Sequence, residues 1–374
     1  MNTIQDRTVL DAVAAQETDI REISAFVLAH PELGHEEHAT SRELADRLEA
    51  AGYRVERGVG GLPTAFRAEL STGRPGGTVG LLAVYDAAPA HRAADGATVA
   101  THSCGHSAQS AGVLGAALAM AGLRDSLTGS VVVIGCPADE IHAPGTQRLG
   151  SGKALTAAAG VWDGVTAALY VHPEFIDAVW SQSLWMRRET AIVAGGRTLR
   201  NDIEPAPFAA FRRLGTLLPT LDRSRVMVET VVLDGDVEEG SGLSLRAQFL
   251  LFAPEQEEID GLLAGLRDAL PEAVWEHGNA IEAIRPDARV AAAVRDALTA
   301  VGREVRDDIP PLPFATDFGN VTRVVPAALI GVGRPEGWAF HTEGGEPQFA
   351  GPEGVAMARS IAEVLALAAA RLTA

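Results

Sequence analysis

The sequence predicts an α/β protein in which a mostly parallel sheet forms a catalytic domain and a smaller ferredoxin-like α+β domain is inserted into it. Short apolar runs alternate with helical patterns in the first half of the chain, as in a parallel sheet covered by helices. The order then changes to strand, helix, strand, strand, helix, strand, and the first pattern returns near the end. With 374 residues the chain exceeds the ~100–200 typical of one domain. We therefore expect a catalytic α/β domain over residues 1–182 and 285–374 and a lid domain over residues 183–284.

The catalytic domain is expected to begin with two helical segments. Apolar residues recur at helical spacing over residues 7–29, and a second helix is expected over residues 40–51, with Ser41 as its cap. A Gly- and Ala-rich stretch predicts a further helix over residues 108–121. Four short apolar runs predict strands at 64–70, 79–85, 131–134 and 167–171.

The inserted domain and the return to the catalytic domain follow from the same patterns. In the lid we expect a strand at 189–193, a helix at 205–218, strands at 226–233 and 243–252, a helix at 254–269 and a strand at 273–284. In the last segment we expect a helix at 287–301, a strand at 327–332 and a closing helix at 352–372.

The composition excludes several classes of function. The chain has 31 Lys and Arg against 49 Asp and Glu, and its net charge of −18 repels nucleic-acid phosphates and anionic lipids. We expect neither a nucleic acid nor a membrane as partner. Two cysteines cannot build a disulfide framework, and the N-terminus lacks signal and transit features, so a cytoplasmic location is expected. The only lysine is Lys153, which together with abundant Ala and Gly indicates a coding bias rather than a function.

Metal-binding residue types gather at the ends of the predicted strands. Open α/β sheets place their ligands at the carboxyl ends of the strands. Thiolate and imidazole are the usual donors to zinc, and five donors with a spare acid suffice for two divalent ions that activate a water. These residues are Asp86 in YDAAP, Cys104 and His106 in THSCGHS, Asp139 and Glu140 in CPADE, His172 in YVHPE and His341 in AFHTEGG.

Each of these residues also has a purely structural interpretation. A lone Cys is more often a packed small hydrophobe than a ligand, and neighbouring acids are more often solvated. The joint occurrence at strand ends favours the metal site. We interpret Cys136 as a packed thiol and the other histidines as structural or at the rim of a pocket; His142 is the strongest exception because it lies two residues past Glu140. The histidines in this group are His91, His102, His142 and His277.

Several of these segments together resemble the aminoacylase and carboxypeptidase family of metallopeptidases, in the amidohydrolase subgroup that uses a C-G-H ligand motif. The segments are PELGHEEHATSRELADRLEAAGY, GLLAVYDAAP, HSCGHSAQSAGVLGAALA, GCPADE, YVHPE and ATDFGNVTRVVPA. They occur in the family's order from about Pro31 to His341. The resemblance implies a bimetal catalytic domain with an inserted lid, which can also carry a homodimer contact.

The resemblance also assigns roles to individual residues. The implied metal ligands are Cys104, His106, Glu140, His172 and His341, and the implied cofactor is two divalent ions, zinc first, with manganese or nickel as alternatives. The implied water-activating acid is Asp139. We predict Asp86 as a second catalytic residue. For substrate binding we predict His142, Asn201, Thr316 and Asp317.

The departures from the family pattern keep more than one function open. Members usually have two glutamates after Pro-Ala, whereas here the first is Asp139, and the lid lacks the family's histidine. Our first hypothesis is a metal-dependent amidohydrolase that cleaves small amides such as N-acyl amino acids or dipeptides. The alternatives are a biosynthetic cyclase or transferase on the same scaffold and a non-catalytic binding homologue.

Overall fold

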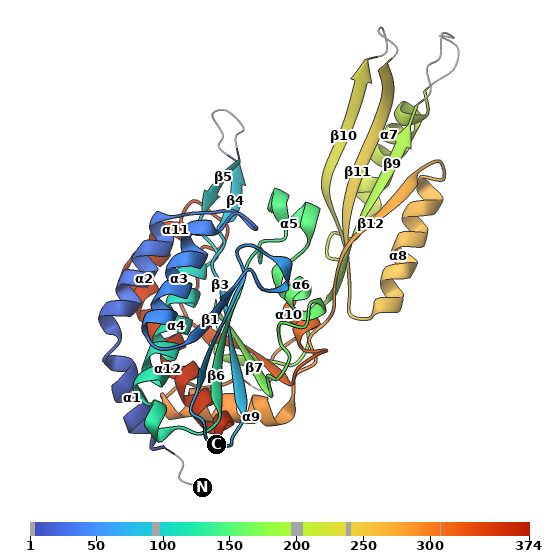
Figure 1. Cartoon of the computed structure of the whole chain (residues 1–374). Helices are drawn as coiled ribbons and strands as arrows, with labels where there is room; N and C mark the ends of the chain where they lie inside the picture. Colours follow the sequence, from blue (N-terminus) through green and yellow to red (C-terminus); the bar gives the residue numbers. More distant parts are fainter. Residues whose placement is uncertain (1–3, 92–97, 196–204, 237–240, 307) are drawn as a thin grey trace. The chain divides into compact units, whose positions relative to one another are not determined.

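The computed structural model describes residues 4–91, 98–195, 205–236, 241–306 and 308–374 (Figure 1). The chain divides into two compact units. The larger unit consists of Met1–Gln182, Ile284–Pro311 and Asp317–Ala374, and the smaller one consists of Ser183–Ala283 and Leu312–Thr316. The grouping of Leu312–Thr316 with the smaller unit is a feature that the sequence patterns did not indicate.

The larger unit contains a seven-stranded mixed sheet in the order β1-β2-β6-β3-β7-β13-β8. Its centre is parallel, because β6, β3, β7 and β13 run in the same direction, while β1, β2 and β8 pair antiparallel at the two edges. The predicted α/β class with a mostly parallel sheet is confirmed. The strands are β1 Arg54–Arg57, β2 Phe66–Ser71, β3 Thr78–Val84, β6 Ser130–Cys136, β7 Ala167–Glu174, β8 Ala178–Trp180 and β13 Ala327–Gly333.

The central strands are apolar along nearly their whole length because both faces of the sheet are covered. All residues of β3 and β6 after the first are buried. Helix α4 contacts β3, β6 and β7, while α12 contacts β3, β7 and α4 (Figure 1). The long helices of this unit are α1 Asp6–Ala14, α2 Glu17–Ala29, α3 His38–Ala50, α4 His106–Gly122, α9 Ala288–Ala300 and α12 Pro352–Thr373.

The N-terminal helices differ from the prediction in two respects. The helical run expected over residues 7–29 is two helices, α1 and α2, which are separated by two residues. Ser41 is not the cap of the next helix, since α3 already begins at His38. The carboxylate of Glu32 instead accepts hydrogen bonds from the backbone N–H groups of Ala39 and Thr40 at 2.8 and 2.9 Å. This carboxylate satisfies the helix start from outside the helix, a contact that local sequence spacing cannot indicate.

Several short elements of the larger unit were not predicted because they are too short for a periodic pattern. A two-stranded hairpin precedes the C-G-H segment, and two short helices fill the loop after Glu140. The unpredicted elements also include two helices near the C-terminal end of the unit. They are β4 Ala88–His91, β5 Thr98–Thr101, α5 Pro144–Leu149, α6 Gly152–Ala158, α10 Phe318–Val321 and α11 Gly345–Ala350, in addition to the short edge strands β1 and β8.

The smaller unit has the ferredoxin-like arrangement of a four-stranded antiparallel sheet with two helices. Its strand order is β10-β11-β9-β12, so its first strand, β9, lies between the third and the fourth. Helices α7 and α8 pack their apolar faces on β9 and β11, and Phe249 and Leu251 form the middle of that core. The elements are β9 Trp185–Ala194, α7 Ala206–Leu217, β10 Val226–Asp236, β11 Ser241–Ala253, α8 Gln256–Ala269 and β12 Val274–Ile281.

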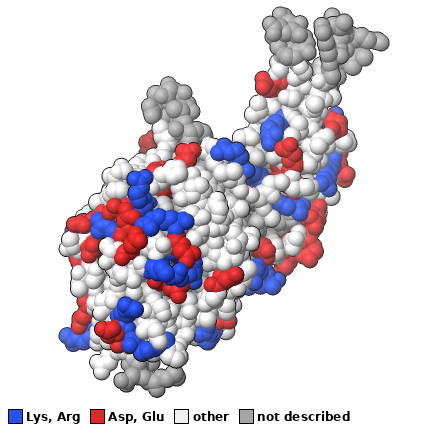
Figure 2. Space-filling view, in the orientation of Figure 1, with Lys and Arg blue, Asp and Glu red and all other residues white. Residues whose placement is uncertain are grey.

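Charges of both signs share the surface. On the face drawn in Figure 2, acidic and basic side chains are interspersed rather than gathered into one basic patch. In the larger unit, for example, Arg47 lies 3.3 Å from a carboxylate oxygen of each of Asp19 and Glu22 and 2.7 Å from Glu43. Among the described residues, the helices include none with the length and apolar character needed to cross a membrane.

Candidate metal centre

The parallel strands bring most of the predicted donors to one edge of the central sheet. Asp86 follows β3, Asp139 and Glu140 follow β6, and His172 lies near the end of β7. Neighbouring parallel strands end on the same side of a sheet, so residues far apart in sequence meet there. The topology of the sheet therefore explains why these residues, which the sequence places at strand ends, lie close together.

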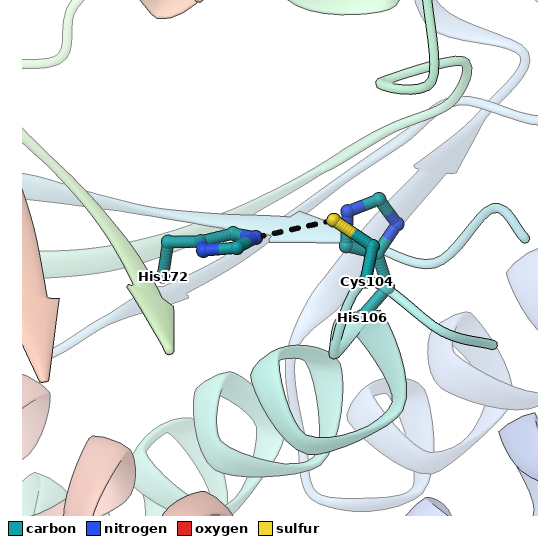
Figure 3. A group of neighbouring side chains, drawn as sticks. All are labelled: Cys104, His106 and His172. Atoms are coloured by element: carbon teal, nitrogen blue, oxygen red, sulfur yellow. Dashed lines mark hydrogen bonds between the residues drawn. The ribbon is translucent and has the colours of Figure 1, made fainter. Parts of the chain in front are cut away.

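Cys104 and His106 reach this edge from the start of α4 (Figure 3). The residue between them, Gly105, has φ +95°, and a Cβ at this position would lie 2.8 Å from the Phe349 ring. Glycine is the residue that takes this left-handed conformation without strain, and the turn lets the side chains on both sides face the same space. The Cys104 Sγ lies 3.6 Å from His172 Nε2.

Second partners orient the two imidazoles. His106 Nδ1 lies 2.7 Å from the Asp86 carbonyl oxygen and 3.0 Å from its carboxylate, and His172 Nδ1 lies 2.7 Å from the Pro173 carbonyl oxygen. Both rings therefore place the proton on Nδ1 and direct Nε2 toward the cluster. Asp86 also accepts a 2.8 Å hydrogen bond from the Glu140 backbone N–H, so this one buried carboxylate positions two predicted ligands.

The five predicted ligands form two groups of three that share Cys104. One group is Cys104, His106 and His172, and the other is Cys104, Glu140 and His341; within each, the ligand atoms lie within 4.8 Å of one another. His341 is held in place by a 3.1 Å hydrogen bond from its backbone N–H to the Ser103 carbonyl oxygen and has φ +55°. The geometry thus offers two adjacent positions for a cation with a thiolate between them.

Some polar atoms of these groups have no hydrogen-bond partner among the described residues, and a bound cation would satisfy them. Among the described residues, His106 Nε2 and Glu140 Oε1 are buried without a hydrogen bond, which is costly unless something else satisfies them. Burial raises the pKa of the Cys104 thiol to about 12 and that of Glu140 to about 7. Burial and the nearby His106 lower the pKa of His172 to about 3, which keeps that imidazole neutral as a ligand must be.

Asp139 lies beside this group. Its side chain is 16 % exposed, and its Oδ2 lies 3.2 Å from His106 Nε2 and 3.4 Å from the Tyr170 hydroxyl, which donates to it. Its Oδ1 pairs with the ammonium of Lys153. The residue before it, Ala138, has φ +56°, and its backbone N–H donates a 2.7 Å hydrogen bond to the buried carboxyl of Glu37. Glu37 therefore holds the peptide before Asp139, while Lys153 and Tyr170 hold the Asp139 side chain.

The structure treats the four predicted substrate-binding residues differently. His142 is exposed, and its charge, after burial and His106, contributes to lowering the pKa of His341, so it borders the same site. Asp317 is 1 % exposed and bound to Lys153, which leaves it no surface for a substrate and argues against the predicted role. Thr316 belongs to the smaller unit, and Asn201 lies outside the described residues.

His102, His277 and Cys136 have surroundings that fit a structural role. His102 is buried, and burial lowers its pKa to about 4. His277 lies in the smaller unit, where its Nδ1 is 2.6 Å from the Glu189 carboxylate. Cys136 is buried beside the Thr156 hydroxyl, and the side chain of His91 lies outside the described part of the chain.

Sequence reasoning missed three residues around Asp139. Lys153 and Tyr170 touch its carboxylate, and Glu37 holds the preceding peptide. One signal for Lys153 was present, because it is the only lysine of the chain and it follows the Gly-containing loop after Glu140. Tyr170 and Glu37 look like an ordinary strand residue and an ordinary helix-start acid, and only their positions in space distinguish them.

Comparison with known proteins gives a family match over most of the chain. The model of Peptidase family M20/M25/M40 matches residues 81–363. One of the subunits of the p-aminobenzoyl-glutamate hydrolase of Escherichia coli is 34% identical over 178 residues, which cover 45% of this chain and 35% of that protein. Thermostable carboxypeptidase 2 of Saccharolobus solfataricus is 30% identical over 197 residues, which cover 50% of this chain and 48% of that protein. The chain thus spans about half or less of the length of these curated relatives.

Solved structures show the same fold over the whole chain. A putative aminohydrolase from methicillin-resistant Staphylococcus aureus superposes with a TM-score of 0.71 at 22% identity and covers 99% of this chain and 100% of its own. The Bacillus subtilis YXEP protein, described as a dinuclear metal-binding peptidase, gives a TM-score of 0.68 at 20% identity and covers 96% of this chain and 99% of its own. At these identities the two structures support the fold.

Proposed function

Because the chain belongs to peptidase family M20/M25/M40, we propose that it is a metal-dependent amidohydrolase that cleaves small amides such as N-acyl amino acids or dipeptides. One observation supports this most directly. Five donors form two groups that share Cys104, and the Asp139 carboxylate lies 3.2 Å from one of these donors. A set of clustered donors with a further acid beside it is what a hydrolytic metal centre requires.

The donor chemistry selects the type of cation. A thiolate and three imidazoles suit zinc, and manganese or nickel are the alternatives that one carboxylate and imidazoles also accept. Cys104, His106 and His172 would hold one ion, and Cys104, Glu140 and His341 the other. The dinuclear metal binding attributed to the YXEP protein agrees with two ions.

Two bound divalent ions supply Lewis-acid polarisation of an amide carbonyl and lower the pKa of a water to near neutrality. The rest of the reaction falls to residues of this chain. Asp139 takes the proton of the attacking water on Oδ2 and passes it to the leaving nitrogen. Asp86 keeps the His106 ring and the Glu140 backbone in place. Tyr170 donates to the Asp139 oxygen that carries the proton, and this contact restrains the direction in which the carboxylate points.

The short acid favours a second candidate function. Asp139 stands where family members usually have the longer glutamate, and withdrawing a base by ~1 Å can cost on the order of a hundredfold in rate. A biosynthetic cyclase or transferase that uses the same ions without an attacking water would tolerate this withdrawal. The two candidates differ in whether water is the second substrate.

A substrate screen distinguishes them. The purified chain, supplied with zinc or manganese, is incubated with N-acetyl amino acids, dipeptides and p-aminobenzoyl-glutamate, and free amines are quantified. We expect release of amine that a chelator abolishes and added metal restores. Hydrolysis that persists in the chelator contradicts a metal-dependent reaction. Failure to hydrolyse any of these amides by the metal-loaded chain contradicts the amidohydrolase and leaves the biosynthetic candidate.

A further inference from the structure

The only lysine of the chain lies beside the proposed general base. Lys153 is the second residue of α6, and its side chain has no exposed surface. Burying an ammonium costs several kcal/mol unless opposite charges surround it. Every other basic side chain apart from histidine is an arginine, so the one long, flexible ammonium of the chain occupies a fully buried position.

Two carboxylates receive this ammonium. Lys153 Nζ lies 2.7 Å from Asp317 Oδ1 and forms an ion pair with Asp139 Oδ1. It also stands 4.9 Å from the centre of the Tyr170 ring, and the hydroxyl of that ring donates to Asp139. The cation therefore contacts Asp139 both directly and through the ring that bonds to it.

Asp317 makes one end of this arrangement rigid. Its Oδ2 accepts hydrogen bonds from the backbone N–H groups of Lys153 at 2.8 Å and Ala154 at 3.2 Å, while Oδ1 faces the ammonium. The carboxylate is thus fixed to the same helix that carries the lysine. The ammonium held by Asp317 cannot follow Asp139 if the latter rotates, so it restrains the rotamer of Asp139.

The first residue of α6 lies against the turn that carries Asp139. Gly152 N–H donates to the Ala138 carbonyl oxygen at 3.3 Å, and a Cβ on Gly152 would collide with the Pro137 carbonyl. Only a glycine allows the start of α6 to lie this near the turn that carries Asp139. The glycine at position 152 therefore allows the next residue, Lys153, to place its ammonium against Asp139.

We propose that Lys153 is the positioning residue of the general base. Its ammonium, anchored by Asp317, holds Oδ1 of Asp139 and leaves Oδ2 directed at the metal centre, where His106 Nε2 lies 3.2 Å away. This inference rests on the proposed function for the role of Asp139. It explains how an acid one methylene shorter than glutamate is kept at a defined place, because a short side chain with one oxygen tethered has few rotamers left.

The first test follows the lysine itself and needs no substrate. Selective ¹⁵N labelling of lysine gives this chain a single Nζ resonance, because there is one lysine. We expect Asp139→Asn and Asp317→Asn each to shift that resonance or to speed the exchange of its protons. Asp177→Asn is the matched control, since Asp177 pairs with Arg303 at 2.7 Å elsewhere in the same unit, and it should leave the resonance unchanged. If Asp139→Asn changes neither the Nζ resonance nor the exchange of its protons, the proposal is overturned.

The second test separates positioning from general stabilisation. With the amide that the screen finds to be hydrolysed fastest, Lys153→Met should lower kcat on the order of a hundredfold, with KM within about threefold and the metal content unchanged. In an Asp139→Asn background the same change should cost no more than about twofold, because the residue through which it acts is gone. Losses that multiply in the double variant, or a change confined to KM, contradict a positioning role.

Two further variants keep the test decisive. Arg303→Met removes an ion pair with Asp177 that involves neither Lys153 nor Asp139, and it should leave kcat unchanged. If Lys153→Met does not fold, Asp317→Asn retains the lysine while releasing its anchor and should still lower kcat about tenfold; unchanged kcat in that variant overturns the proposal. If none of the screened amides is hydrolysed, the proposed function fails, and the Nζ resonance still decides whether Lys153 holds Asp139.

Discussion

The two units of this protein bury charge in opposite ways. In the smaller unit, Arg188 on β9 forms two hydrogen bonds with Glu229 on β10, at 2.7 and 2.9 Å, and both side chains are almost fully buried. This is a closed pair in which each charge is matched by its neighbour. In the larger unit, buried charges meet in a cluster that leaves His106 Nε2 and Glu140 Oε1 without a hydrogen bond among the described residues.

This difference distinguishes buried charges that stabilise the fold from buried charges that can bind a ligand. A bidentate arginine and carboxylate pair matches one charge to the other through two hydrogen bonds, so it stabilises a local arrangement. A cluster with unsatisfied buried acceptors is costly to the metal-free protein, and such a cost is ordinarily found at functional sites. Burial alone therefore does not identify the site; here the unpaired buried atoms also belong to the two groups of candidate ligands.

Replacing a metal ligand should give the largest effect. His106→Ala should lower turnover by at least ~10³-fold, because bound ions supply several kcal/mol of charge stabilisation. It should also lower the metal content measured by elemental analysis. His277→Ala, in the smaller unit and paired with Glu189, is the control and should keep the wild-type metal content. An unchanged stoichiometry in His106→Ala means that this residue is not a ligand.

Removing the proposed base should affect rate without affecting metal. Asp139→Asn should reduce turnover by ~10²–10⁴-fold, the usual contribution of a general base, while elemental analysis still finds the wild-type metal content. Full activity in this variant contradicts the role of Asp139. Asp139→Glu gives a second readout. A loss of activity indicates a site shaped around the shorter acid and its lysine, whereas a gain indicates that the shorter acid is a less effective base than glutamate.

Breaking the closed pair should affect stability alone. Arg188→Met leaves the buried Glu229 charge without its principal partner and should cost the smaller unit about 3–5 kcal/mol of unfolding free energy. Urea unfolding followed by tryptophan fluorescence measures this cost, with Trp185 and Trp275 reporting on that unit and the other three tryptophans on the larger unit. Arg246→Met removes an exposed pair with Glu276 in the same sheet and should cost less than about 1 kcal/mol. Equal costs for the two variants contradict the comparison, as does a loss of metal in Arg188→Met.

The pH dependence of stability gives a further test. Burial and the charge of Asp86 raise the pKa of Glu37 from 4.5 to about 8, so the folded protein binds this proton more tightly than the unfolded chain. The contribution of Glu37 to stability is therefore fully present below about pH 4.5 and is lost as the pH rises through 8. In the metal-free protein, Glu37→Gln should flatten the decline of unfolding free energy between about pH 5 and 8.5. The exposed neighbour Glu36, changed to Gln, should keep the wild-type slope.

The fold and the candidate metal ligands could both be predicted from the sequence, and for the same reason. Apolar runs identify the central strands, and residues that directly follow such strands share one edge of a parallel sheet. Asp86, Glu140 and His172 could therefore be placed near one another from the sequence alone. The ferredoxin-like order of the smaller unit was equally visible, since each of its elements is long enough to show its own period.

The surroundings of Asp139 were not accessible because they depend on tertiary approach. Helix α6 has seven residues, too few for a periodic signal, and the meaning of Lys153 arises only from the contact between Gly152 and the turn after β6. Asp317 looked like a substrate contact in sequence because nothing local indicates that it is buried. Ser41 failed as a helix cap for a similar reason, since Glu32 supplies that function from outside the helix.

Five residues of the larger unit are proposed to form a two-ion site, and counting bound metal tests this most directly. The chain is stripped with a chelator, dialysed, titrated with zinc and, separately, with manganese, and analysed for bound metal per chain. We expect two ions per chain, with protons released as the first binds, because burial keeps the Cys104 thiol protonated in the metal-free protein and a coordinating thiol loses its proton. No metal after purification and none taken up from either titration would contradict the two-ion site.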